Sequence, residues 1–159
     1  MRIWTLEREQ WVPAGLEETF AFFADAANLE RLTPAFLGFS ILTPLPVAMR
    51  AGTLIEYRLR LFGLPLRWLT RIEVWEPGQR FVDRQLRGPY ALWVHTHAFE
   101  RSGSGTLVRD RVEYALPLDP LSRPARALFV RPTLERLFDF RRTEVARALG
   151  GAPGADQAH

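Results

Sequence analysis

The 159-residue sequence contains no cysteine and no lysine, and it has no long apolar run. The absence of cysteine excludes a disulfide framework, a thiolate metal site and a cysteine nucleophile. No segment approaches the ~20 consecutive apolar residues of a membrane-spanning helix, so we expect no stable membrane insertion. The N-terminal stretch alternates and carries charge, unlike the apolar core of a secretion signal, which predicts a cytoplasmic protein.

The isoelectric point near 10.1 would suggest a nucleic-acid partner if the basic residues were clustered. All 21 basic residues are arginine, however, and arginine keeps its proton far above neutral pH. A modest net charge of +3 therefore persists into the alkaline range and raises the isoelectric point. Because the arginines are interspersed with Asp and Glu along most of the chain, we expect no binding to nucleic acid.

What the chain does have is 47% hydrophobic residues, enough for the core of a single domain over residues 1–149. Segments in which apolar and polar residues alternate are separated by the turn signals GLP, EPGQ, RGP and SGSG. Near the C-terminus the spacing of the apolar residues becomes that of a helix. The Gly/Ala-rich residues 150–159 are predicted to be a disordered tail. The expected strands are 2–12, 38–42, 53–62, 66–76, 79–87, 90–101 and 106–117, and the expected helices are 16–24, a turn or two between Asn28 and Pro34, and 121–149, in which Pro132 either kinks the helix or begins its longer segment.

Two histidines lie two residues apart in the segment WVHTHAFE, residues 93–100. Successive strand side chains point to opposite faces, so Trp93, His95, His97 and Phe99 share one side. The turn at 102–105 aligns this strand with the next and puts His97 opposite Asp110, while the opposite face carries Arg109, Arg111 and Glu113. We therefore predict that the histidine face points inward and that His97 and Asp110 form a hydrogen bond of roughly 2.6–3.2 Å.

The EPGQ turn allows the same reasoning for the preceding hairpin. Placing Trp75 opposite Arg80 aligns Val74 with Phe81, Ile72 with Asp83 and Thr70 with Gln85. Asp83 and Gln85 are then predicted to point inward as well.

The order of elements, one strand, two short helices, six further strands and a long C-terminal helix, resembles the helix-grip fold of START and Bet v 1 proteins, the SRPBCC or polyketide cyclase/dehydrase superfamily. The runs GTLIEYRLRLFGLPLRW, FVDRQLRGPYALWVHTHAFE, GTLVRDRVEYALP and LFDFRR are similar to those of a bacterial branch of that superfamily. The resemblance covers about residues 1–149. It implies an α+β fold in which a curved antiparallel sheet of about seven strands wraps around the C-terminal helix.

A cavity between this sheet and the C-terminal helix is the expected ligand site, because such sites are apolar hollows with a few convergent polar groups. Aromatic residues would supply its wall, and a cluster of Asp, Gln and His would orient the ligand. Arg141, on the apolar stripe of the helix, would either cross-link the sheet edge or meet an acidic group of the ligand. The candidate ligand-binding residues are Tyr57, Trp68, Thr70, Asp83, Gln85, Trp93, His95, His97, Tyr114, Phe138 and Arg141.

Two functions follow from this site. The first is binding of a hydrophobic small molecule such as a lipid, an isoprenoid or a polyketide-like ring. The second is a cyclase or dehydratase, as the resemblance suggests, in which Asp110 holds His97 in one tautomer and His97 acts as general acid/base on a carbonyl compound. In a third interpretation, the His and Asp side chains only satisfy each other's hydrogen bonds inside the core.

Metal binding and self-association are the remaining alternatives. The i, i+2 histidines lack a recognisable ligand motif, so we expect no metal, and the glycines form turns instead of a phosphate-binding loop, so we expect no nucleotide cofactor. Val82, Leu86, Leu92 and Val94 would form an apolar strip on the outer face of the sheet that a homodimer could bury.

Overall fold

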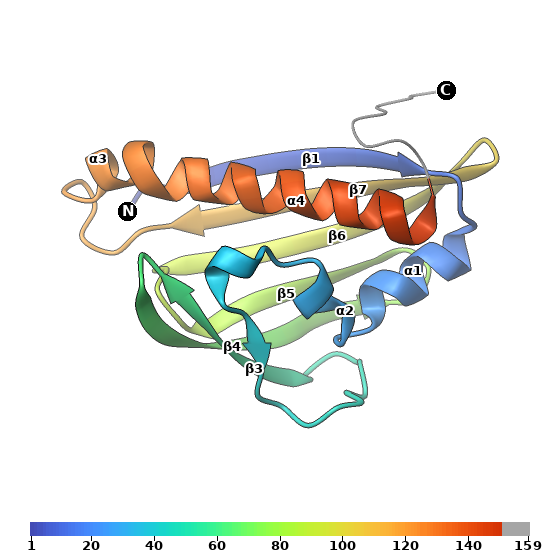
Figure 1. The fold of residues 1–159 in the computed structure, drawn as a ribbon, viewed down its shortest axis with the longest axis horizontal. Coiled ribbons are helices and arrows are strands. Elements are labelled where there is room, and N and C mark those ends of the chain that lie inside the picture. Colours follow the sequence, from blue (N-terminus) through green and yellow to red (C-terminus); the bar gives the residue numbers. More distant parts are fainter. Residues whose placement is uncertain (151–159) are drawn as a thin grey trace.

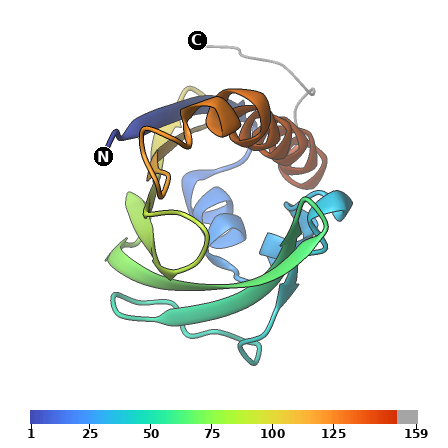
Figure 2. The ribbon, with the colours of Figure 1, turned by 90° about the vertical axis from the view of Figure 1, so that its left-hand side faces the viewer.

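A computed structural model describes residues 1–150. Its seven antiparallel strands form one curved sheet in the order β1-β7-β6-β5-β4-β3-β2, and a long C-terminal helix lies along the concave side of that sheet (Figure 1). Viewed end-on, sheet and helices surround the interior of the molecule (Figure 2). The predicted helix-grip fold is therefore confirmed. The strands are β1 Trp4–Val12, β2 Ser40–Ile41, β3 Leu54–Leu61, β4 Leu64–Glu76, β5 Arg80–Arg87, β6 Leu92–Ser102 and β7 Gly105–Ala115.

The helices close the open side of the sheet. The C-terminal helical segment, residues 123–149, contains a π-helical turn at Arg126–Val130. Pro132 follows this turn and lies in the first turn of the long helix α4, Arg131–Leu149. A proline is tolerated there because the first N–H groups of a helix have no intrahelical acceptor. Pro132 thus begins the longer segment of the helix. The helices are α1 Leu16–Ala24, α2 Asn28–Arg31, η1 Ala35–Leu37, α3 Arg123–Ala125, η2 Arg126–Val130 and α4 Arg131–Leu149.

The register between β6 and β7 is the one that the SGSG turn predicts. His97 lies opposite Asp110, and Trp93 lies opposite Tyr114. His95 and His97 are only 4% and 5% exposed, so the histidine face points inward as expected. A slip of one residue would have put both rings on the solvent side.

The register between β4 and β5 differs from the prediction. Glu76, not Trp75, lies opposite Arg80, and Trp75 lies opposite Phe81. Glu73 is then an extra residue in β4, a bulge that restores the expected pairs of Ile72 with Asp83 and of Thr70 with Gln85. The prediction assumed a regular ladder, and a bulge leaves no mark in the alternation on either side of it.

The outer apolar strip is smaller than predicted. Val82 is buried at 9% exposure, and Leu92 and Val94 are half-buried, so only Leu86 is freely exposed, at 43%. A homodimer through this strip stays a prediction. Residues 151–159 of the predicted disordered tail lie outside the described residues.

Candidate functional site

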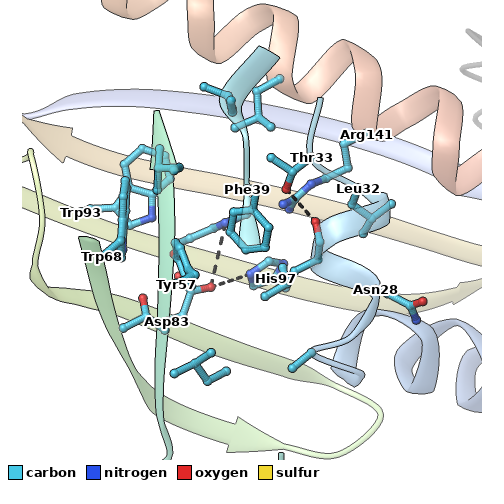
Figure 3. A pocket seen from close by; sticks show the side chains of 18 of the residues that line it. Asn28, Leu32, Thr33, Phe39, Tyr57, Trp68, Asp83, Trp93, His97 and Arg141 are labelled. Atoms are coloured by element: carbon cyan, nitrogen blue, oxygen red, sulfur yellow. Dashed lines mark hydrogen bonds and ion pairs between the residues drawn. The ribbon is translucent and has the colours of Figure 1, made fainter. Parts of the chain in front are cut away.

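A cavity of about 140 Å³ lies between the concave face of the sheet, the N-terminal helices and α4 (Figure 3). A single water needs roughly 10–15 Å³ on the same measure, so the cavity has room for on the order of ten waters or one small organic ligand. Its lining is mostly apolar. The lining residues that the sequence predicted are Tyr57, Trp68, Thr70, Asp83, Trp93, His95, His97 and Arg141.

Aromatic rings form one wall of the cavity. Trp68 makes an edge contact with Trp93 at 5.2 Å between ring centroids, packs against Tyr90 at 5.6 Å and stacks on Tyr57 at 5.8 Å. Phe39 extends the wall from the other side of Tyr57, at 4.7 Å. Ring pairs at such separations hold one another in place, so the wall is a fixed surface for an apolar ligand.

Two hydrogen-bonding atoms in this wall have no partner among the described residues. They are the indole Nε1 of Trp68 and the hydroxyl Oγ1 of Thr70, and both are buried. Buried polar atoms in folded proteins are nearly always paired. These two are therefore available to a ligand with hydrogen-bonding groups.

Four side chains from the adjacent strands β5, β6 and β7 form the polar part of the site, and their hydrogen bonds run diagonally between strands. His97 Nε2 donates to Asp83 Oδ2 at 2.8 Å, and His95 Nε2 donates to Asp110 Oδ1 at 2.8 Å. His97 Nδ1 is 3.3 Å from Asp110 Oδ1 but lacks hydrogen-bond geometry. The predicted His97 and Asp110 hydrogen bond is therefore wrong. The two imidazoles stack at 3.7 Å, and each one binds the aspartate that lies opposite the other.

The contacts within the cluster of Asp83, His95, His97 and Asp110 shift the pKa values of all four side chains. Burial would raise the pKa of Asp83 and of Asp110, but the hydrogen bonds and charges of the histidines outweigh it and hold both pKa values below the ordinary one. Burial lowers the pKa of His95, and the neighbouring charge of His97 lowers it further. Burial would also lower the pKa of His97, but contacts with Asp110 and Asp83 raise it. Both aspartates are therefore carboxylates at neutral pH, and His97 holds a proton more readily than His95 does.

Because the pKa values of both aspartates are lower in the folded protein than in the unfolded chain, the free energy of unfolding should decrease at low pH. Each carboxyl contributes stability that is present above its ordinary pKa of about 3.9 and is lost as pH falls through the lower pKa of the folded state. We expect the free energy of unfolding to drop below about pH 4 by up to ~1.4 kcal/mol per pH unit for each carboxyl. Urea titrations between pH 2.5 and 6 measure this slope. Asp139→Asn, at an exposed surface pair, should leave it unchanged, and an equally flat profile in both proteins would contradict the assignment.

Arg141 enters the cavity from α4 and is 9% exposed. Its Nε is buried without a hydrogen-bond partner among the described residues. The guanidinium carbon lies 5.3 Å from the ring centroid of Phe138 on the same helix. Arg141 therefore does not cross-link the sheet edge, which was one of its two expected roles.

Four predicted site residues lie elsewhere. Gln85 clamps the loop that carries Tyr90, since its Nε2 donates to the Tyr90 carbonyl at 2.8 Å and its Oε1 accepts from the Tyr90 N–H at 3.2 Å. Tyr114 is buried beside the cavity and accepts a hydrogen bond from Arg126 at 3.1 Å. Phe138 belongs to the core behind the lining, and Asp110 borders the cavity only through its hydrogen bond to His95.

Sequence reasoning missed the side of the cavity formed by the N-terminal helices and the loops before and after β2. Their lining residues are mostly ordinary apolar side chains, which carry no chemical signal. Tyr90 was also missed, because the predicted strand 90–101 included it and the alternation that turns Trp93 inward assigned Tyr90 to the opposite face, whereas β6 begins only at Leu92. The main missed lining residues are Phe23, Leu29, Leu32, Thr33, Leu37, Phe39, Met49 and Tyr90.

Asp83, His95 and His97 place one potential metal ligand each within 4.8 Å of one another. Both Nε2 atoms already donate to carboxylates, so a metal bound through these two nitrogens would have to displace two hydrogen bonds of 2.8 Å. The expectation of a protein without metal or cofactor stays a prediction. No helix in the described part of the chain is both long and apolar enough to cross a membrane.

Fold and cavity together define a helix-grip protein with an interior cavity between its sheet and helices. Residues 12–139 match the family model described as polyketide cyclase / dehydrase and lipid transport. The chain therefore belongs to the polyketide cyclase/dehydrase and lipid transport family. A search of curated proteins finds no match.

Solved structures share the fold. The Zhui aromatase/cyclase from a Streptomyces species has a TM-score of 0.73 at 13% identity, covering 93% of this chain and 94% of that one. A Thermus thermophilus protein has a TM-score of 0.63 at 22% identity, covering 91% and 98%. A nucleoside-diphosphate sugar epimerase from Corynebacterium glutamicum has a TM-score of 0.65 at 25% identity, with 91% of this chain matching 29% of that longer one.

Proposed function

We propose that the protein binds a hydrophobic small molecule, such as a lipid, an isoprenoid or a polyketide-like ring, inside this cavity. The observation that carries the proposal is the aromatic wall of Tyr57, Trp68, Tyr90 and Trp93 around a space large enough for one ligand. Burying apolar surface supplies most of the affinity in such sites, and a few polar groups fix the orientation. The family to which the chain belongs is described by lipid transport as well as by cyclase chemistry.

The polar atoms in the cavity favour a ligand that also carries oxygen. Burial, together with the charge of Asp83, raises the pKa of Tyr57 above its ordinary value, so its hydroxyl stays protonated at neutral pH. Unpaired Trp68 Nε1 supplies a second donor. A pure hydrocarbon would leave such donors unsatisfied.

Replacing Trp93 with alanine should weaken binding of a neutral apolar probe, N-phenyl-1-naphthylamine, by at least tenfold, which is about 1.4 kcal/mol. The indole of Trp93 lies on the wall at 7% exposure, and a tryptophan side chain offers a large apolar area to a ligand. Fluorescence titration measures the dissociation constant, and circular dichroism checks that the variant is folded. Native mass spectrometry of the purified protein should also reveal a co-purifying organic molecule.

The matched comparison is His97→Asn, which should weaken binding of the same probe less than Trp93→Ala does, because an imidazole offers less apolar area. If neither variant alters binding of any molecule in a broad hydrophobic panel, the cavity is a packed core and the proposal is wrong.

The His and Asp cluster supports a second function, general acid/base catalysis of a cyclase or dehydratase type. The geometry changes the expected pair: Asp83, not Asp110, holds His97 Nε2 at 2.8 Å. An imidazolium held by carboxylates can donate a proton to a carbonyl oxygen and, once neutral, take a proton from carbon. If His97→Asn keeps ligand affinity but abolishes turnover of a carbonyl compound, this function is supported over simple binding, because the loss would be confined to the transition state.

A further inference from the structure

We propose that the ligand carries a carboxylate and that Arg141 is its anion-binding residue. This inference rests on the proposed ligand-binding function. The juxtaposition behind it is a buried, unpartnered guanidinium at one side of a cavity whose opposite side is an aromatic wall.

Arg141 differs from other arginines of the same helix. Arg131 pairs with Glu135 at 3.0 Å and Arg147 with Glu144 at 2.8 Å, and the side chains of both arginines are exposed. Arg141 is buried, and no carboxylate of the described residues forms an ion pair or a hydrogen bond with it. A surface arginine without a partner is ordinary, whereas a buried one is not.

The two aspartates of the cluster already accept hydrogen bonds from histidines. Asp83 attracts Arg141 through the longer-range interaction between their charges, but its Oδ2 accepts the hydrogen bond from His97. Asp110 accepts from His95. The hydrogen-bond donors of the Arg141 guanidinium are therefore left for an acceptor that the ligand brings.

A carboxylate is the anion that fits best. Its two oxygens match the planar fork of a guanidinium, which binds them with two parallel hydrogen bonds. A dianion such as a phosphate monoester would place two negative charges near Asp83 and Asp110, and within the described lining of the cavity Arg141 is the one basic side chain not bonded to them. A ligand with a single negative charge matches that single guanidinium.

The position of Arg141 also gives the ligand a direction. Figure 3 shows Arg141 reaching down from α4 beside Leu32 and Thr33, while Trp68 and Trp93 lie on the other side of the cavity. Apolar side chains make up most of the rest of the lining, with Leu37, Ile55 and Leu134 among them. The ligand class is thus an amphipathic monocarboxylic acid, its acid group at Arg141 and its apolar body against the aromatic wall.

The test compares 2-naphthoate with 2-naphthamide, two probes of nearly the same shape that differ in charge. We expect wild-type protein to bind the carboxylate roughly 10- to 100-fold more tightly than the amide, as hydrogen bonds to charged groups imply. Isothermal titration calorimetry at pH 7 measures both constants. Arg141→Met should remove this preference while keeping the affinity for the amide, and Arg141→Lys should keep only part of it. The exposed control Arg147→Gln should keep all of it.

The outcomes separate this inference from the function on which it rests. If the amide and N-phenyl-1-naphthylamine bind but the carboxylate has no advantage, the carboxylate assignment is overturned and hydrophobic binding stands. A folded Arg141→Met protein that retains the preference would overturn Arg141 as the anion site. Should Arg141→Met fail to fold, the wild-type preference and its reduction in Arg141→Lys decide. If none of the three probes binds, both proposals fail.

Discussion

Replacing Asp110 with asparagine is expected to lower the free energy of unfolding by about 3–5 kcal/mol, the usual cost of removing one partner from a buried charged pair. Asp110 accepts the hydrogen bond of His95 at 2.8 Å and lies 3.3 Å from His97 Nδ1. Its side chain is 13% exposed, so water cannot replace the lost charge. His97, whose protonated form both aspartates favour, would then keep Asp83 as its one bonded carboxylate among the described residues.

Urea denaturation at pH 7 measures this loss, with Asp139→Asn as the matched control. Asp139 also pairs with an arginine, Arg8 at 2.8 Å, but its side chain is 65% exposed, so its replacement should cost at most about 1 kcal/mol. The double variant His95→Leu, Asp110→Leu should be less destabilised than Asp110→Asn, because it removes two buried polar groups together. A cost below about 1 kcal/mol for Asp110→Asn would show that the cluster is solvated and not the rigid network described above.

Replacing Phe138 with alanine should have an effect of similar size, about 3–5 kcal/mol. Phe138 is 4% exposed and fixes α4 to the sheet by packing among Val112, Tyr114 and Leu134. Its ring also contacts His95 edge-on at 5.6 Å. The loss combines the transfer of a large apolar side chain with the cavity that remains behind the ligand site.

The C-terminal segment offers its own control in Phe129, which is 52% exposed. Phe129→Ala should change the free energy of unfolding by no more than about 0.5 kcal/mol, as is usual for surface positions. Both values come from urea denaturation monitored by circular dichroism. Equal effects at the two positions would mean that α4 is not held to the sheet through Phe138.

The sequence allowed the inward face of β6 and its register with β7 to be predicted, because strict alternation over residues 93–99 and a short turn leave only one pairing. The partners of the two histidines could not be predicted in this way. Register decides which Cα atoms face one another, but strand side chains also lean along the strand direction. Here the rings of His95 and His97 stack on each other, and the Nε2 atom of each ring binds the aspartate that lies diagonally from it on the neighbouring strand.

The remaining differences have two separate causes. The β4 bulge at Glu73 depends on the curvature of the sheet, which is a property of all its strands together. Gln85 faces inward as predicted by its pairing with Thr70, yet the loop at Tyr90 captures both ends of its amide. An inward position is thus necessary for a place in the lining but not sufficient for it.

The extra residue in β4 also bears on which molecules the protein accepts. A bulge bends its strand and increases the local twist, and β4 contributes Trp68, Thr70 and Ile72 to the wall of the cavity. The width of the cavity therefore depends on the number of residues between Trp75 and Thr70 as well as on the side chains that face the ligand. Deleting Glu73 would therefore change the shape of the cavity without replacing any residue that lines it.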